Sequence, residues 1–120
     1  QVEATCQVVV KPAKTQITAC KKTRDRNVYV KVKAQKNVSG IQFQLSRDKK
    51  FKGRKSSYYA GATETKATTA ALKKSKTYYF RARMYIDYGG KRYYGAWSQV
   101  KKVKTGKKSR LSGSSSWKAV

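Results

Sequence analysis

Residues 78–90 read YYFRARMYIDYGG and carry the clearest structural signal in the chain. Apolar and polar side chains alternate with a period of two, which is typical of a β-strand with one buried face and one outer face. The predicted core positions are Tyr78, Phe80, Ala82, Met84 and Ile86. The predicted outer positions are Tyr79, Arg81, Arg83 and Tyr85. Whether this outer row of arginine and tyrosine binds a partner or only packs is the functional question that the stretch raises.

The two glycines at the end of this stretch predict a tight turn. Glycine can take a positive φ at both central positions of such a turn, as a two-residue hairpin requires. The chain then returns through WSQVKKVK at 97–104, with Val100 and Val103 as its apolar residues. Residues 78–104 therefore predict a β-hairpin, and the spacing of the two valines predicts a twist or bulge in its second strand.

The same alternation recurs upstream. In NVYVKVKA at 27–34, the predicted core residues are Val28, Val30, Val32 and Ala34. In GIQFQLS at 40–46 they are Ile41, Phe43 and Leu45, opposite Gln42, Gln44 and Ser46. The threonine-rich segment at 65–76 predicts a short strand ending at Leu72 rather than a helix. About seven short strands, spaced by about ten residues, predict an all-β antiparallel sandwich.

The charge of the chain is strongly unbalanced. Thirty lysines and arginines face five acidic residues, which gives a formal net charge of +25. Such a field attracts polyanions, although a well-solvated surface explains the charge equally well. Histidine is absent, and the two cysteines match no zinc spacing. The scattered acids offer little for general acid–base chemistry, so we expect no enzyme, metal site or cofactor.

Composition also sets the expected boundaries. No apolar run approaches the roughly 18 residues that a membrane-spanning helix needs, so no membrane span is expected. After residue 105 the composition changes to glycine, serine and lysine, which predicts a flexible basic tail over 106–120. We therefore expect a leading segment over 1–11, a β-sandwich over 12–105 and the tail.

Leu72, followed by Tyr78 and its alternating strand, resembles the tyrosine corner of fibronectin type III domains. In that family the leucine closes the core beside a turn, and the tyrosine hydroxyl bonds to the backbone of that turn. KPAKTQITACKKT, RNVYVKVKA, SGIQFQLSRDKKF and GAWSQVKKVKT resemble the other strands of the same fold. The sequence departs from the family at Val32, where a core tryptophan is usual, and at Lys74 and Ser75, where Pro-Gly is common.

Lysine-rich versions of this pattern are similar to fibronectin type III domains of secreted or cell-surface proteins of Gram-positive bacteria. The resemblance implies a noncatalytic, extracellular spacer or adhesion module. EATCQVVVKP at 3–12 resembles the last strand of a bacterial group 2 immunoglobulin-like domain, which implies an upstream domain in a longer chain. Cys6 and Cys20 would then lie on neighbouring segments, where either a disulfide worth about 3 kcal/mol or two separately packed thiols is expected.

The candidate ligand-binding residues are the basic and aromatic side chains predicted to lie outside the core. They are Lys49, Lys50, Lys52, Arg54, Lys55, Arg81, Arg83, Lys91, Arg92, Tyr93 and Tyr94. The lysines can alternatively serve to block edge-to-edge strand pairing. Arg81 and Arg83 can alternatively stack on Trp97 or Tyr85, as in the tryptophan–arginine ladders of cytokine-receptor versions of this fold. We expect an anionic polysaccharide or wall polymer as the partner, and nucleic acid is the alternative.

Overall fold

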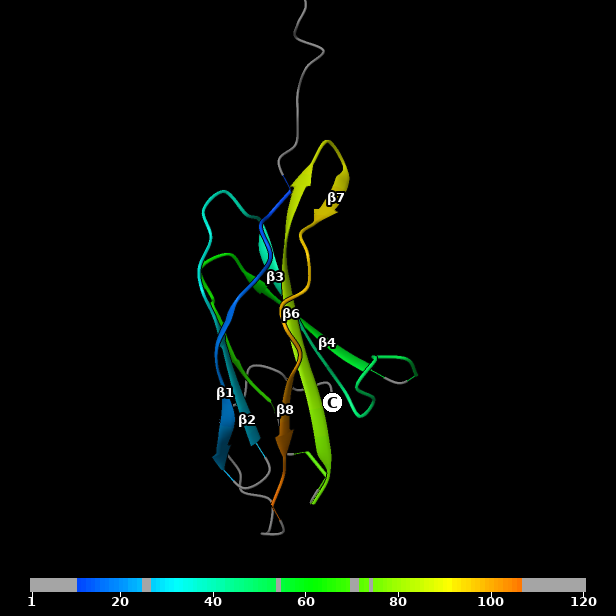
Figure 1. Ribbon diagram of the computed structural model, residues 1–120. Helices are drawn as coiled ribbons and strands as arrows, with labels where there is room; N and C mark the ends of the chain where they lie inside the picture. The colour runs from blue at the N-terminus through cyan, green and yellow to red at the C-terminus, as the bar shows by residue number, and fades with distance from the viewer. Residues whose placement is uncertain (1–10, 25–26, 54, 70–71, 74, 107–120) are drawn as a thin grey trace, which may run out of the picture.

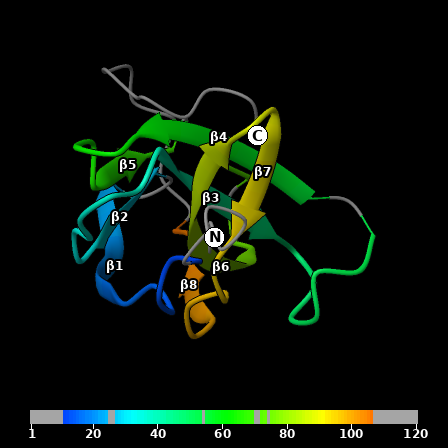
Figure 2. The ribbon, with the colours of Figure 1, turned by 90° about the horizontal axis from the view of Figure 1, so that it is seen from above.

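The computed structural model describes residues 11–24, 27–53, 55–69, 72–73 and 75–106, and they form two antiparallel sheets packed face to face (Figures 1 and 2). The smaller sheet has the order β1-β2-β5, with β1 (Ile17–Arg24), β2 (Asn27–Val32) and β5 (Lys66–Thr68). The larger sheet has the order β4-β3-β6-β7, and β8 also pairs with β6. Its strands are β3 (Gly40–Ser46), β4 (Lys55–Gly61), β6 (Thr77–Tyr88), β7 (Lys91–Tyr94) and β8 (Lys101–Lys104). The predicted all-β sandwich is confirmed. Its described part has eight strands rather than about seven, because β7 forms at residues 91–94, between the turn and the strand predicted at 97–104.

The core lies between the two sheets and follows the predicted alternation. The inward residues of β2, β3 and β6 are almost fully buried: Val28, Val30, Val32, Ile41, Phe43, Leu45, Phe80, Ala82 and Met84. Burial of each large side chain contributes about 1.5–3 kcal/mol, so these three strands dominate the packing. Two predicted core positions are wrong. Ala34 is exposed because β2 ends at Val32, and Ile86 is only half-buried where β6 runs on into its pairing with β7.

The predicted hairpin is confirmed, and its turn contains Gly89 and Gly90 with φ of 59° and 78°. Its second strand is interrupted where Gly95 N donates to Met84 O at 2.9 Å and Ser98 N donates to Ala82 O at 2.7 Å. Four residues, 95–98, thus lie opposite three, 82–84, which is the arrangement of a β-bulge. The predicted irregularity exists, but it lies before Val100 rather than between the two valines. Val100 is 44% exposed because β8 begins only at Lys101.

The strand before β6 is shorter than the predicted strand that ends at Leu72. β5 ends at Thr68, and Thr69 continues the contact with β2, because Thr69 N donates to Val28 O at 2.9 Å and Thr69 Oγ1 accepts from Val28 N at 3.0 Å. Residues 70–71 lie outside the described part. Leu72 is buried, and the Tyr78 hydroxyl accepts a hydrogen bond from Lys73 N at 3.1 Å. This is the contact that the resemblance to a tyrosine corner predicts. No described segment is a helix long and apolar enough to cross a membrane.

The outer face of β3 is buried, although its polar residues suggested a solvent-facing side. Gln42 is 4% exposed and Gln44 is 5% exposed, and Ser46 beyond them is also buried. Polar side chains at such depth require hydrogen-bond partners. Their partners come from β6 and β4, and they define the candidate site.

Candidate functional site

Two arginines on the outer face of β6 are stacked between aromatic rings. The guanidinium carbon of Arg81 lies 4.1 Å from the ring centroid of Phe51 and 3.9 Å from that of Trp97. That of Arg83 lies 4.2 Å from the Trp97 centroid and 3.6 Å from the Tyr94 centroid. We call this row, Phe51–Arg81–Trp97–Arg83–Tyr94, the arginine ladder. Each stack contributes about 0.5–1 kcal/mol when exposed and about 2 kcal/mol when desolvated.

The bulge in the hairpin places Trp97 in the ladder. The extra residue at 95–98 lets the chain leave the regular pairing while Ser98 keeps contact with β6. Ser98 Oγ accepts from Ala82 N at 2.9 Å, and Ser98 N donates back to the same residue. Gly95 allows this path, because a Cβ there would overlap the backbone of Pro12. Trp97 is thereby half-buried between the two guanidinium groups.

The loop between β3 and β4 places Phe51 at the other end of the ladder. Both oxygens of the Asp48 carboxylate accept backbone N–H groups, from Lys50 at 3.1 Å and Lys52 at 3.0 Å. These two hydrogen bonds hold the pKa of Asp48 below its ordinary value. Phe51 N donates to Asp48 O at 2.9 Å, and Phe51 takes a φ of +56° that turns its ring onto Arg81. Phe51 is consequently buried although it lies in a run of lysines.

The glutamines of β3 bind the edges of the same arginines. Gln44 Oε1 accepts from Arg81 Nε at 2.9 Å and from Arg81 Nη2 at 2.6 Å. Gln42 Oε1 accepts from Arg83 Nε at 2.8 Å, and both glutamine amides donate to Ser57 Oγ on β4. The arginines therefore cover the glutamines, which explains their burial. Burial lowers the pKa of both guanidinium groups, with the charge of Arg83 as a further cause for Arg81, and both remain protonated.

A second stack extends the aromatic row toward the hairpin turn. The guanidinium carbon of Arg92 lies 3.9 Å from the ring centroid of Tyr85, and Arg92 Nε binds the Asp87 carboxylate at 2.8 Å. This ion pair raises the pKa of Arg92. Tyr85 is only 8% exposed and also packs edge-on against Tyr59 and Tyr94. The expected pairing of Tyr85 with Arg81 or Arg83 is therefore corrected, since the cation over its ring belongs to Arg92.

The eleven candidate ligand-binding residues do not form one cluster in the structure. Arg81, Arg83, Arg92 and Tyr94 belong to the stacks just described. Lys91 and Tyr93 alternate with Arg92 and Tyr94 along β7 and so face the opposite side of the sheet. Lys55 Nζ donates to Phe51 O at 3.2 Å, which holds the base of the loop. Arg54 lies outside the described residues.

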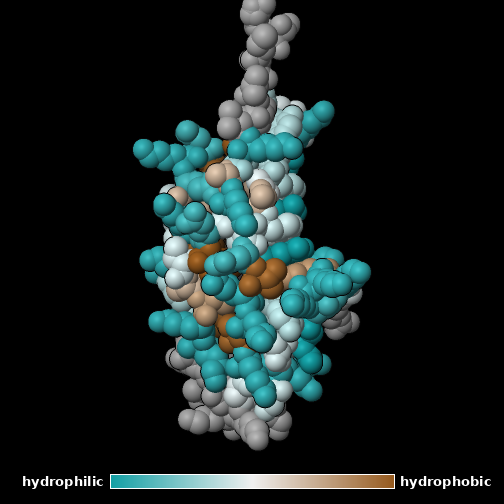
Figure 3. Space-filling model, viewed as in Figure 1, coloured by the Kyte–Doolittle hydropathy of each residue, from teal (hydrophilic) through white to brown (hydrophobic). Residues whose placement is uncertain are grey.

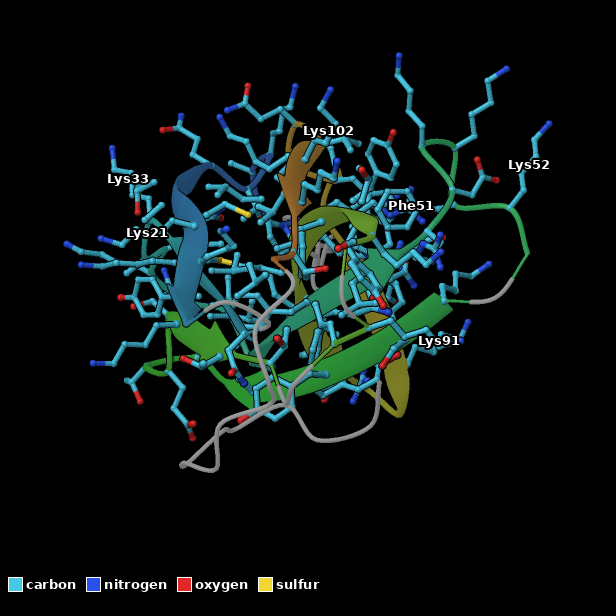
Figure 4. All side chains as sticks on the ribbon, turned by 90° about the horizontal axis from the view of Figure 1, so that it is seen from below. Lys21, Lys33, Phe51, Lys52, Lys91 and Lys102 are labelled. Carbon is cyan, nitrogen blue, oxygen red and sulfur yellow. The ribbon has the colours of Figure 1, made fainter. Side chains whose placement is uncertain are left out.

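Three of the candidates, Lys49, Lys50 and Lys52, are exposed on the β3–β4 loop. We call them the loop lysines. In Figure 4 the labelled Lys52 extends away from the molecule, while Phe51 on the same loop points back toward the sheet. The loop therefore has a buried anchor and an outward cationic rim. Sequence reasoning missed Phe51, Gln42 and Gln44 as parts of this arrangement. The available signal was one phenylalanine inside a lysine run and two glutamines opposite two arginines in alternating strands.

The other residues considered as sites are the two cysteines and possible metal ligands. Cys20 in β1 is half-buried with a free thiol, and Cys6 lies outside the described residues, so the bridge between them stays a prediction. Within the part of the chain that the structure describes, no group of three or more histidine, cysteine, aspartate or glutamate side chains could hold a metal ion. The face seen in Figure 3 is largely hydrophilic, with apolar residues showing in small separate areas.

Comparison with known proteins identifies the fold. No family model matches the sequence, and no curated protein matches it significantly. Among solved structures, an fn3 domain of human contactin 1 is 14% identical with a TM-score of 0.66, over 95% of this chain and 99% of that chain. The FN5 domain of Drosophila Lar is 15% identical with a TM-score of 0.62, over 81% and 100%. An fn3 domain of the human collagen alpha-1(XX) chain is 17% identical with a TM-score of 0.51, over 90% and 93%. At these identities the likeness shows the fold alone, and the chain is a fibronectin type III-like β-sandwich.

Proposed function

We propose that this chain is a noncatalytic module of a secreted or cell-surface bacterial protein, and that it contacts an anionic polymer through the loop lysines. The observation that carries the proposal is the division of the positive charge. The guanidinium groups of the ladder arginines stack on aromatic rings with their faces and bind glutamines with their edges. By contrast, Lys49, Lys50 and Lys52 are exposed on a loop held by Asp48 and Phe51. A loop already fixed in shape loses less conformational entropy when it binds.

The charge of the whole chain favours the same partner class. With a net charge of +25, the domain attracts polyanions from a distance, and the loop lysines are well-hydrated point charges that suit sulfate, carboxylate or phosphate groups. Binding of this kind weakens as salt screens the charges over a Debye length of about 10 Å at 0.1 M. An anionic wall polymer or an acidic glycan has the required chemistry.

The course of the chain supports a role as a spacer within a longer protein. In Figure 1 the described chain enters at one end of the sandwich and leaves β8 at the opposite end. Domains with this arrangement can be joined in series, so that each one adds its length to the chain. A spacer role and polymer binding are compatible, because the loop lysines lie to the side of the path from end to end.

The test is a titration of the intact chain against immobilised heparin and against purified wall teichoic acid, at low and at high salt. We expect binding at low ionic strength that falls steeply as salt is added. The variant K49Q/K50Q/K52Q should bind clearly less polymer than the native chain. The matched control K11Q/K14Q/K36Q removes the same charge from exposed lysines elsewhere and should lose little. Absence of binding to either polymer at low salt, or equal losses in the two variants, would refute the proposal.

Nucleic acid is the second candidate, and the charge of the chain favours it as well. Base recognition by single-strand binders uses open aromatic faces. In this structure guanidinium groups stack on the rings of Trp97 and Tyr94, so these rings are less available to stack on bases. The described geometry therefore supports a glycan or wall polymer more strongly than a nucleic acid. Duplex DNA, single-stranded RNA and anionic glycans compared at matched salt separate the two. A preference for one nucleic acid that persists above about 200 mM salt would reverse the ranking.

A further inference from the structure

A second group of lysines lies on the outer face of the three-stranded sheet. Residues paired directly across antiparallel strands point to the same side. Tyr29 on β2 pairs with Lys21 on β1, and Lys31 on β2 pairs with Lys66 on β5. Lys33 follows two residues after Lys31 and is exposed, as are Lys21, Lys31 and Lys66. We call these four lysines, together with the half-buried Tyr29, the lysine sheet face.

The direct pairing of Lys31 with Lys66 opposes folding. Like charges placed opposite each other on neighbouring strands are destabilising, whereas an opposite charge would stabilise the pair. Of the acids in the described part, Asp48 accepts hydrogen bonds from loop amides and Asp87 forms an ion pair with Arg92. Glu64 is therefore the described acid that can offset the lysine charges of this face. Among the described side chains, one carboxylate beside four ammonium groups gives this face a net positive charge. A bound anion would therefore reduce the repulsion between Lys31 and Lys66.

A depression at the edge of this face, next to Lys66, can receive the ligand. It has a volume of about 430 Å³, and Tyr29, Glu64, Lys66 and Thr68 are among its lining residues. A tyrosine ring in such a depression can pack against the apolar face of a sugar, while Lys66 in its lining binds an acidic substituent. The four cations named here are lysines, which are compact point charges, whereas bidentate recognition of phosphate groups in nucleic acid is typical of arginine. These features favour an anionic glycan over a nucleic acid.

The lysine sheet face and the loop lysines lie on opposite sides of the molecule. The labelled Lys21 and Lys33 extend from one side in Figure 4, and Lys52 extends from the other. We infer that the outer face of β1-β2-β5 is a second binding surface for anionic glycan, so that one domain holds two glycan chains at once. This inference rests on the proposed function at the loop. It adds that the module cross-links anionic polymer rather than only attaching to it.

Calorimetric titration with a heparin octasaccharide at low salt tests the inference, because it reports the number of fragments bound per chain. We expect two fragments for the native chain, one for K31Q/K66Q and one for K49Q/K50Q/K52Q. The control K11Q/K14Q should still bind two. Each variant is first shown to be folded by circular dichroism. K31Q/K66Q should be at least as stable as the native chain, since it removes a repulsion.

The outcomes separate this inference from the proposed function. One fragment on the native chain, abolished by K49Q/K50Q/K52Q, would overturn the second face and leave the loop site standing. Two fragments on K31Q/K66Q would likewise overturn it. No binding by the native chain would overturn both. Displacement of the fragment from K49Q/K50Q/K52Q by a lower concentration of single-stranded oligonucleotide of equal charge would overturn the assignment of this face to glycan.

Discussion

Replacement of Trp97 by alanine is the sharpest test of the arginine ladder. The indole is sandwiched by two guanidinium groups, whose carbons lie 3.9 and 4.2 Å from its ring centroid. Two such stacks at a half-buried site are worth about 1–3 kcal/mol together. Loss of a fully buried tryptophan costs about 3–5 kcal/mol, and Trp97 is only half-buried, so its packing adds a fraction of that value. We expect W97A to lower the free energy of unfolding by about 2–3 kcal/mol.

Urea denaturation followed by far-ultraviolet circular dichroism measures this loss without using tryptophan fluorescence. With a slope of about 1.5 kcal/mol/M, the midpoint should fall by about 1–2 M while the slope itself stays unchanged. Val100→Ala is the matched control, because Val100 lies nearby and is 44% exposed. It should stay within about 0.5 kcal/mol of the native chain. A W97A midpoint equal to that of V100A would refute the structural role of the ladder.

Three further predictions concern single positions. Gly40→Ala should destabilise the domain by about 1–3 kcal/mol, because a Cβ there would overlap the Tyr85 hydroxyl; an unchanged thermal midpoint would contradict this packing. The pKa of Asp48 is lowered by backbone hydrogen bonds, so its stabilising effect is present above its ordinary pKa of 3.8 and is lost as the pH falls below that value. Urea unfolding between about pH 2 and 5 should therefore show a steeper loss for the native chain than for D48N, and parallel curves would be the contrary result. Burial raises the pKa of the Cys20 thiol to about 12, against a weaker effect of Lys101, so iodoacetamide at pH 8 should label it only after unfolding. Rapid labelling of the folded chain would contradict this, and a two-dalton mass difference on reduction would show the bridge to Cys6.

The sequence predicts the fold well because the core alternates cleanly. Val28, Val30 and Val32, like Phe80, Ala82 and Met84, occupy every second position, and an antiparallel sandwich is the simplest way to bury both rows. The errors fall where tertiary contacts replace regular pairing. Ala34 and Val100 continue an apolar pattern past the end of a strand, and periodicity alone does not mark where hydrogen bonding stops.

The candidate site was less predictable for a physical reason. Charge and aromaticity identify which side chains could bind a ligand, but they do not reveal which are already occupied within the fold. Arg83 and Lys52 look equivalent in the sequence, yet Arg83 is enclosed by Trp97, Tyr94 and Gln42, whereas Lys52 is exposed. That difference depends on the β-bulge and on the left-handed backbone of Phe51, and neither has a reliable local signature.

The central claim is that the arginines of β6 support the sandwich while the loop lysines meet the partner. The most direct measurement compares heparin affinity at low salt for folded R83M and folded K49Q/K50Q/K52Q. The account predicts that R83M loses stability but keeps most of its affinity, allowing for one lost charge, and that K49Q/K50Q/K52Q keeps its stability but has a heparin affinity well below that of R83M. If R83M loses as much affinity as the lysine variant, the arginine ladder faces the polymer and the account is wrong.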